Sequence, residues 1–171
     1  MFRLQDSKEI PLLRVNAHVY KHSSFGCTHL HLDCDSTEKA FSVAFRTIPK
    51  DHTGIAHILE HTVLCGSEKF PVRDPFFMMT RRSLSTFMNA MTYPDITAYP
   101  FATLNDKDFS NLLSVYLDAA FFPNIDELDF MQEGHRFELI KDGDKEKLAL
   151  KGVVYNEMKG AMSSVPRQLW H

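Results

Sequence analysis

The residues most able to do chemistry are two histidines and a glutamate in one short segment, His57-Ile58-Leu59-Glu60-His61. On an α-helix each residue advances by about 100°, which places His57, Glu60 and His61 on one arc. Ile58 and Leu59 then point elsewhere, into a core. Two imidazoles at positions i and i+4 can both reach one Zn²⁺ at about 2.0–2.1 Å, and a carboxylate beside them can take a proton from water that the metal makes acidic. The spacing H-x-x-E-H therefore predicts a hydrolytic zinc centre with Glu60 as general base.

A catalytic zinc site of this kind needs a third protein ligand and leaves its fourth position for water. The chain offers three downstream carboxylates for that role, Glu133, Glu138 and Glu157. We favour Glu157, because it falls on an expected helix among apolar neighbours, where a carboxylate is costly to bury without a metal or another partner. Two alternatives stay open: a solvated Glu157, and an amphipathic helix that carries two histidines and a glutamate without any metal.

Other reactive side chains have simpler explanations. Cys27, His29 and His31 alternate along one face of an expected strand and could bind a metal, but a half-exposed sheet face is the better interpretation. Cys65, just past the histidine helix, is expected to be a buried small hydrophobe rather than a redox switch. His135 could substitute as a metal ligand, although its short, glycine-containing context makes this the weaker hypothesis.

The elements that must position these residues follow from hydrophobic periodicity and from turn and cap residues. Alternating or apolar runs predict strands over 13–19, 27–34 and 40–48, with 35–39 as a hairpin loop, so the chain is expected to open with an antiparallel meander. Further on, Thr53 is expected to cap the histidine helix, and Asp74-Pro75 to open the next one. The expected helices cover 54–64, 74–82, 105–122, 126–132 and 153–163.

Two further segments read as strands. The first, 87–103, is broken by a turn at 93–95, and the second, 136–140, is followed by a turn at 142–145. Strands thus come in runs rather than alternating singly with helices. This order predicts an α+β fold in which an antiparallel or mixed sheet packs with helices.

Composition excludes several classes of protein. The chain has 171 residues, 44% of them hydrophobic and 24% charged, with a net charge of −3. It can therefore bury a core, and it lacks the basic excess of a nucleic-acid binder. No apolar run is long enough to span a membrane, and the first residues are not a signal or transit peptide. Three scattered cysteines indicate a reducing compartment, and 14 phenylalanines indicate a large core or an apolar surface for a partner.

Six segments together resemble the pitrilysin-type (inverzincin) zinc metallopeptidases, and most closely their presequence-protease, falcilysin-like branch. The resemblance covers nearly the whole chain. Its motifs are HILEHTVLCGS (57–67), RDPFF (73–77), SLSTFMNA (83–90), DFSNLL (108–113), QEGHR (132–136) and KGVVYNEMKG (151–160).

The resemblance implies the parts of an active site. It makes His57, His61 and Glu157 the zinc ligands, which settles Glu157 over Glu138, and it makes Glu60 the catalytic base. It also implies that Asn89-Ala90 lies on a sheet edge that pairs with an extended peptide substrate, a mode of binding that uses backbone hydrogen bonds and reads little sequence. The implied fold is the pitrilysin-like domain, which is shared with LuxS and the processing peptidases.

The resemblance also implies a larger enzyme. Members of this branch have four homologous α+β domains in two halves that close into a chamber, so residues 1–171 are expected to be an incomplete N-terminal catalytic domain whose partner is the missing C-terminal half. The expected substrates are short unstructured peptides such as cleaved targeting presequences. The expected compartment is mitochondrial or another organellar matrix in a eukaryote, or the cytoplasm in a bacterium. The alternative is a non-catalytic zinc-binding or structural subunit that needs a partner chain.

Overall fold

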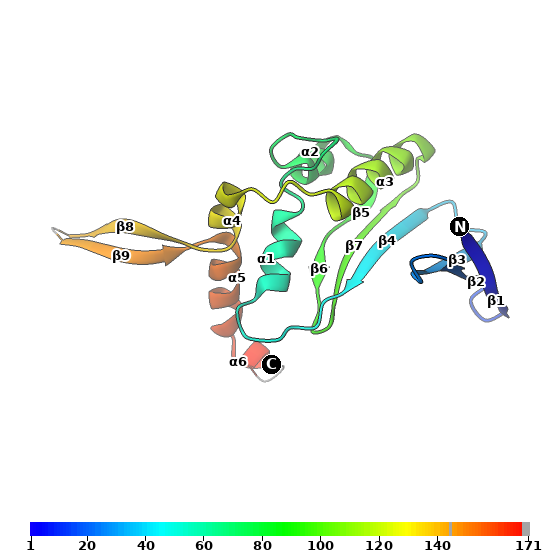
Figure 1. Cartoon of the computed structure of the whole chain (residues 1–171), viewed down its shortest axis with the longest axis horizontal. Coiled ribbons are helices and arrows are strands. Elements are labelled where there is room, and N and C mark those ends of the chain that lie inside the picture. The colour runs from blue at the N-terminus through cyan, green and yellow to red at the C-terminus, as the bar shows by residue number, and fades with distance from the viewer. Residues whose placement is uncertain (144, 169–171) are drawn as a thin grey trace. The chain divides into compact units, whose positions relative to one another are not determined.

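The computed structural model describes residues 1–143 and 145–168, and it divides the chain into two compact units, Met1–Glu38 and Lys39–His171. Figure 1 shows the elements of both units in chain order. Because the site lies in the second unit, the first is described only briefly.

The first unit is a three-stranded antiparallel sheet of order β1-β2-β3. Its strands are β1 (Phe2–Ile10), β2 (Val15–His22) and β3 (Thr28–Cys34). The pairing of Ala17 with Leu32 and of Val19 with Leu30 gives the sheet one apolar face. The meander expected from the sequence is confirmed for β2 and β3. Strand β1 was not expected, because most of its residues are polar and exposed and no apolar alternation marks it.

The second unit is built on a sheet of order β4-β7-β5, in which the short β6 also pairs with β7. Its strands are β4 (Lys39–Arg46), β5 (Ser85–Met88), β6 (Met91–Thr92) and β7 (Ile96–Thr103). The expectation that 35–39 is a hairpin loop is wrong, because β4 pairs with β7 and not with β3. Phe41 and Val43 on β4 lie opposite Phe101 and Tyr99 on β7. The rings of Phe101 and Tyr99 are buried in the core, and the partly buried Phe41 and Val43 pack against it.

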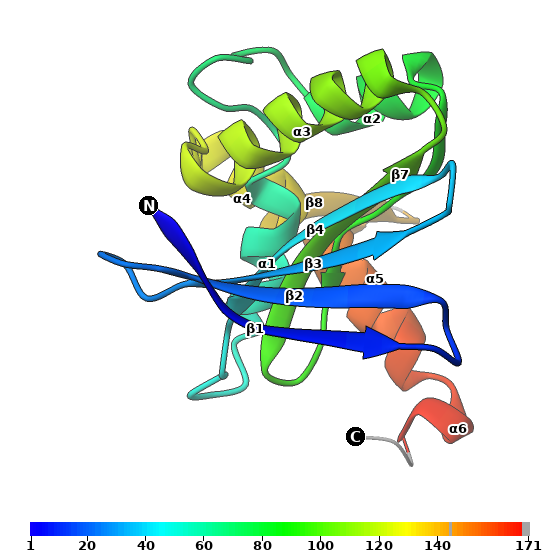
Figure 2. The ribbon, with the colours of Figure 1, turned by 90° about the vertical axis from the view of Figure 1, so that its right-hand side faces the viewer.

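Helices cover one face of this sheet, and the core lies between the two layers. Its buried centre consists of Val63, Tyr99, Phe101, Leu112 and Tyr116. The covering helices are α1 (Ile55–Thr62), α2 (Pro75–Arg82) and α3 (Asp106–Phe121). Asn105 caps α3, since its side chain accepts a hydrogen bond from the Asp108 backbone N–H. Figure 2 shows α3 running along the strands that it covers.

The remaining elements bring the end of the chain back to α1. They are α4 (Glu127–Glu133), β8 (Arg136–Asp142), β9 (Lys145–Lys151), α5 (Val153–Met162) and α6 (Val165–Gln168). Helices α4 and α5 pack against each other and against α1, while the β8–β9 hairpin extends away from them (Figure 1). Strand β9 was not expected, because its sequence KEKLALK is mostly charged. The predicted α+β class is confirmed. In the ranges that the structure describes, no helix is both long and apolar enough to cross a membrane.

Candidate metal centre

Helix α1 places His57 and His61 one turn apart, with their ring centroids 5.0 Å apart. Both imidazoles are partly buried and line a pocket of about 490 Å³. The N-cap of the helix is Gly54, whose positive φ of 71° suits glycine, and not the expected Thr53. Thr53 is engaged elsewhere, because its hydroxyl and backbone N–H both donate to Asp51.

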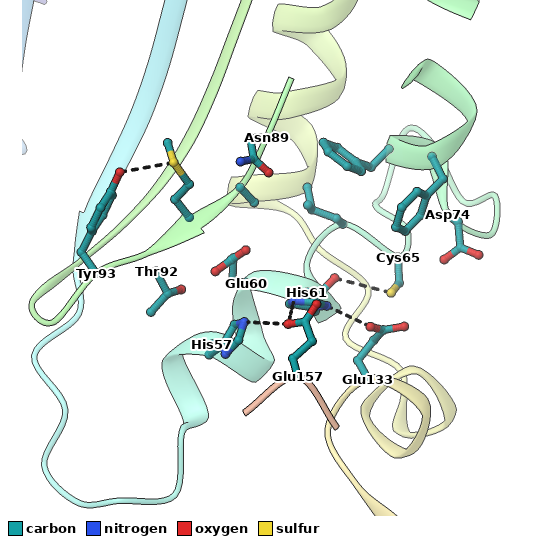
Figure 3. A pocket seen from close by; sticks show the side chains of 15 residues that line it. His57, Glu60, His61, Cys65, Asp74, Asn89, Thr92, Tyr93, Glu133 and Glu157 are labelled. Carbon is teal, nitrogen blue, oxygen red and sulfur yellow. Dashed lines mark hydrogen bonds and ion pairs between the residues drawn. The ribbon is translucent and has the colours of Figure 1, made fainter. Parts of the chain in front are cut away.

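Glu157 reaches the two imidazoles from α5. Its Oε2 atom lies 3.5 Å from His57 Nε2 and 3.6 Å from His61 Nε2. Two ligands bound at about 2.0–2.1 Å to a tetrahedral ion lie about 3.3–3.4 Å from each other. The observed spacings are close to that value, and two imidazoles with one carboxylate are a donor set typical of catalytic zinc. The three residues therefore fit a metal ion, and Figure 3 shows their side chains converging.

Glu133, one of the three carboxylates considered as a ligand, lies on the other side of the His61 ring. Its Oε2 atom is 3.0 Å from His61 Nδ1, and the carboxylate is almost fully buried, with 10% of the side chain exposed. With Nε2 turned toward Glu157, Nδ1 is the nitrogen left to donate a hydrogen to Glu133. A carboxylate in this place orients an imidazole ligand and raises its basicity. The positions of the acidic residues in the sequence do not show which carboxylate binds the metal and which one orients His61.

Glu138 and His135 do not join the cluster. Glu138 lies on β8, where Lys151 and Arg136 donate to its carboxylate, and these hydrogen bonds hold the pKa of Glu138 below its ordinary value. The exposed His135 packs edge-on against the Phe130 ring. Each therefore has a local partner on the hairpin or on α4, away from the imidazole pair.

Glu60 lies on the pocket side of α1 together with the two histidines, and only 7% of it is exposed. Within the described ranges no cation pairs with its carboxylate. The expectation that Leu59 points into a core is wrong, because Leu59 is 40% exposed.

Asn89 and Ala90 line the same pocket, and Figure 3 shows Asn89 across it from α1. They lie in the short break between β5 and β6, both of which pair with β7 on one side only. The Asn89 N–H donates to the Pro100 carbonyl at 3.1 Å, and its carbonyl accepts from the Tyr116 hydroxyl at 3.3 Å. Among the described strands none pairs with the other side, so these residues belong to a sheet edge.

The rest of the pocket wall is largely apolar. Leu64, Phe76, Phe77 and Met91 line it, and the Phe77 side chain is well exposed. Cys65 also contributes to the wall, yet it is buried, as expected, and burial raises the pKa of its thiol to about 12. A thiol in this state is a poor nucleophile, so the pocket carries no reactive cysteine of its own.

A second metal site on β3 receives no support. His29 and His31 lie on one face of β3, and their rings stack with centroids 6.3 Å apart, as His31 also does with His18 at 6.1 Å. Within residues 1–143 and 145–168, the one group of three whose ligand atoms converge is that of His57, His61 and Glu157. All residues of β3 are exposed, on both faces of the strand, so the sheet is more open than the half-exposed face favoured from the sequence.

Comparisons with known proteins show the family to which the chain belongs. Residues 46–158 match the sequence model of the family described as Insulinase (Peptidase family M16). The chain is 55% identical over 165 residues to a protein of Candida albicans named "Presequence protease, mitochondrial", and 55% identical over 167 residues to one of the same name from Mus musculus. These matches cover 95% and 97% of this chain but only 16% of each relative.

A solved structure shares the fold. The crystal structure of pitrilysin superposes with a TM-score of 0.59 over 74% of this chain and 14% of its own chain, at 20% sequence identity. The pitrilysin-like fold predicted from the sequence is therefore confirmed.

Proposed function

Because the chain belongs to the insulinase family of peptidases (peptidase family M16), we propose that it carries the catalytic metal centre of a zinc metalloendopeptidase, with His57, His61 and Glu157 as the ligands. The observation that carries this proposal is the approach of two imidazole Nε2 atoms to one carboxylate oxygen, at 3.5 and 3.6 Å. A set of three protein ligands leaves one position of a tetrahedral ion open for water, as catalysis requires.

Glu60 is the residue that we assign to proton transfer. It shares the pocket with the ligands, and within the described ranges its carboxylate has no cation to hold it, so it can take a proton from water and deliver it to the departing amine. When bound, a zinc ion supplies Lewis-acid polarisation of the scissile carbonyl and lowers the pKa of water toward neutrality. Glu133 keeps the His61 ring in place throughout.

We assign substrate alignment to the sheet edge at Asn89 and Ala90. Because the edge faces the pocket, a peptide added beside it as an extended strand would run past the metal ligands. Backbone hydrogen bonds would hold the peptide without reading its sequence, and the apolar wall that includes Leu64 and Phe77 would favour a hydrophobic side chain near the scissile bond. This arrangement suits short, unstructured peptides, because a folded protein seldom offers an extended segment.

The names of the relatives support a narrower proposal for substrate and compartment. They are called mitochondrial presequence proteases, and we propose that this chain likewise belongs to an enzyme that degrades cleaved targeting presequences in the mitochondrial matrix. The chain spans only 16% of those relatives. We therefore propose that residues 1–171 are the N-terminal catalytic domain of a longer enzyme, whose remaining part is the partner of this one.

Exposed apolar residues support that partnership. On the β8–β9 hairpin, Phe137 and Leu139 lie opposite Leu150 and Leu148, and Phe137, Leu139 and Leu148 are each more than half exposed. Apolar patches of this kind on a protein surface mark contacts with other protein parts. A chain that lacks those contacts is expected to hydrolyse peptides weakly or not at all by itself.

The test is hydrolysis of a quenched fluorescent peptide by the full-length enzyme and by its Glu60→Gln variant. We expect the kcat of the variant to fall by about 10²–10⁴-fold, which is the typical contribution of one general acid–base group, while its zinc content stays unchanged. Glu127→Gln, at an exposed position on α4, is the matched control and should retain the wild-type rate. Equal hydrolysis by wild type and Glu60→Gln would instead favour a zinc-binding subunit without catalytic function.

A further inference from the structure

We propose that Gln132 and Arg73 are positioning residues, which hold Glu133, and through it the His61 imidazole, in the orientation that metal binding needs. The inference rests on the proposed metal centre. It adds two residues that touch neither the metal ligands nor the substrate pocket, and it gives a role to the Arg73 side chain, which is 72% exposed.

A continuous series of hydrogen bonds runs from the proposed ligand to the surface of the protein. His61 Nδ1 lies 3.0 Å from Glu133 Oε2, and Gln132 Nε2 donates to the other oxygen, Glu133 Oε1, at 2.9 Å. Gln132 Oε1 in turn accepts a hydrogen bond from the Arg73 guanidinium. The series joins α4 to α1 across 72 residues of the chain, and α4 to the loop between α1 and α2 across 59 residues.

The chemistry of each group permits this series to run in one direction only. A guanidinium can only donate, and an ionised carboxylate can only accept. The Gln132 amide lies between them, so its NH₂ must face Glu133 and its oxygen must face Arg73. A flipped amide would set oxygen against carboxylate and NH₂ against guanidinium, and both contacts would repel. Arg73 therefore fixes the amide, and the amide in turn fixes Glu133.

Fixing both carboxylate oxygens has a consequence for the imidazole. A carboxylate held by one hydrogen bond can swing about its last torsion, whereas Glu133 is held at Oε1 by Gln132 and at Oε2 by His61. A rigid acceptor keeps the His61 ring from turning, so Nε2 stays directed at Glu157. The exposed ion pair of Arg73 with Asp74 adds little stability, so the effect of Arg73 is expected in metal binding rather than in folding.

The test measures zinc affinity of the 171-residue chain by competition with a chromophoric chelator, and records the visible spectrum of the Co²⁺ form. The variants are Gln132→Met, which keeps the side-chain length but neither donates nor accepts in this way, and Arg73→Met. We expect each to bind zinc about threefold to tenfold more weakly, less than the loss typical of a residue in direct contact with a ligand. Arg73→Lys, which keeps a donor, should recover part of the affinity. Arg82→Met, at an exposed position at the end of α2, should bind like wild type.

The outcomes separate this inference from the proposed function. A wild-type chain that binds zinc together with variants that bind it equally well, with the same Co²⁺ spectrum, would overturn the positioning role and leave the metal centre standing. A wild-type chain that melts cooperatively but binds no zinc would overturn the metal centre and this inference with it. Thermal melting of each variant shows whether a weakened zinc affinity merely reflects unfolding. If Gln132→Met has both the melting temperature and the zinc affinity of the wild type, the positioning role is wrong.

Discussion

His61 donates through Nδ1 to a buried carboxylate oxygen of Glu133 at 3.0 Å, while its opposite nitrogen faces Glu157. The two carboxylates thus serve one imidazole in different ways. One meets the nitrogen that is turned toward the proposed metal, and the other holds the nitrogen that is turned away from it. The two also differ in burial, because the Glu133 side chain is 10% exposed and the Glu157 side chain is 53% exposed.

Glu133→Ala is expected to weaken zinc binding about 10–100-fold, the loss typical of removing a carboxylate that orients a histidine ligand. The His61 ring would lose its fixed tautomer and its preferred rotation. Zinc affinity measured by chelator competition checks this, with the exposed Glu127→Ala on the same helix as control. Unchanged affinity in Glu133→Ala would mean that the 3.0 Å contact does not orient the ligand.

The three cysteines are expected to differ sharply toward an alkylating reagent. Cys27 and Cys34 are exposed, whereas Cys65 is buried and its pKa is raised to about 12 by burial. At pH 8, iodoacetamide should modify Cys27 and Cys34 in the folded protein and Cys65 only after denaturation, because the thiolate is the reacting form. Mass spectrometry of the digested protein gives the extent at each site. Rapid labelling of Cys65 under native conditions would contradict its burial.

Glu138 is expected to stabilise the β8–β9 hairpin in a way that depends on pH. Hydrogen bonds from Lys151 and Arg136 lower its pKa in the folded state, below the value of 4.5 that applies to an unperturbed glutamate. Its stabilising effect is therefore complete above pH 4.5 and is lost as the pH falls through the lowered pKa. The difference in unfolding free energy between wild type and Glu138→Gln, measured by urea denaturation, should shrink as the pH is lowered below 4.5.

The matched control for that experiment is Glu146→Gln, which removes a carboxylate from an exposed position of the partner strand β9. It corrects for the general effect of one fewer negative charge on the hairpin. A difference between wild type and Glu138→Gln that stays constant from neutral to acid pH would show that the ion pairs with Lys151 and Arg136 do not form in solution.

The parts of the site that depend on local sequence could be predicted, and the parts that depend on packing could not. The helical period alone places His57, Glu60 and His61 on one face, and the structure has them there. The partnership of Glu133 with His61 depends on how α4 packs against α1, which no spacing encodes. Thr53 is not the cap for a different, local reason, because its hydroxyl donates to Asp51 two residues before it.

Strand pairing shows the same limit. The segment around Phe41 reads as a strand in the sequence, but alternation does not state which strand it will join. Proximity along the chain favoured a hairpin with β3, whereas burial of Phe41 against Phe101 is possible only beside β7. Long-range burial therefore overrode the local preference for pairing between neighbours.

Gly152 holds the start of α5 against the end of α4, and its replacement gives the sharpest test of how Glu157 is positioned. A Cβ atom at Gly152 would lie 2.0 Å from the Gly134 carbonyl oxygen, and this backbone cannot yield as a flexible side chain would. Gly152→Ala is therefore expected to lower the unfolding free energy by about 2–3 kcal/mol, as overpacking does, and to displace the helix that carries Glu157. Weakened zinc binding should accompany the loss.

Gly160, on the same helix, supplies the opposite control. It is exposed, and a Cβ atom added there meets nothing within 4 Å, so Gly160→Ala should raise the unfolding free energy by about 0.5–1 kcal/mol through the better helix propensity of alanine. Urea denaturation followed by circular dichroism measures both variants against wild type. Gly152→Ala that unfolds at the wild-type urea concentration would show that α4 and α5 do not meet at this pair of glycines, and the approach of Glu157 to the imidazoles would lose its structural support.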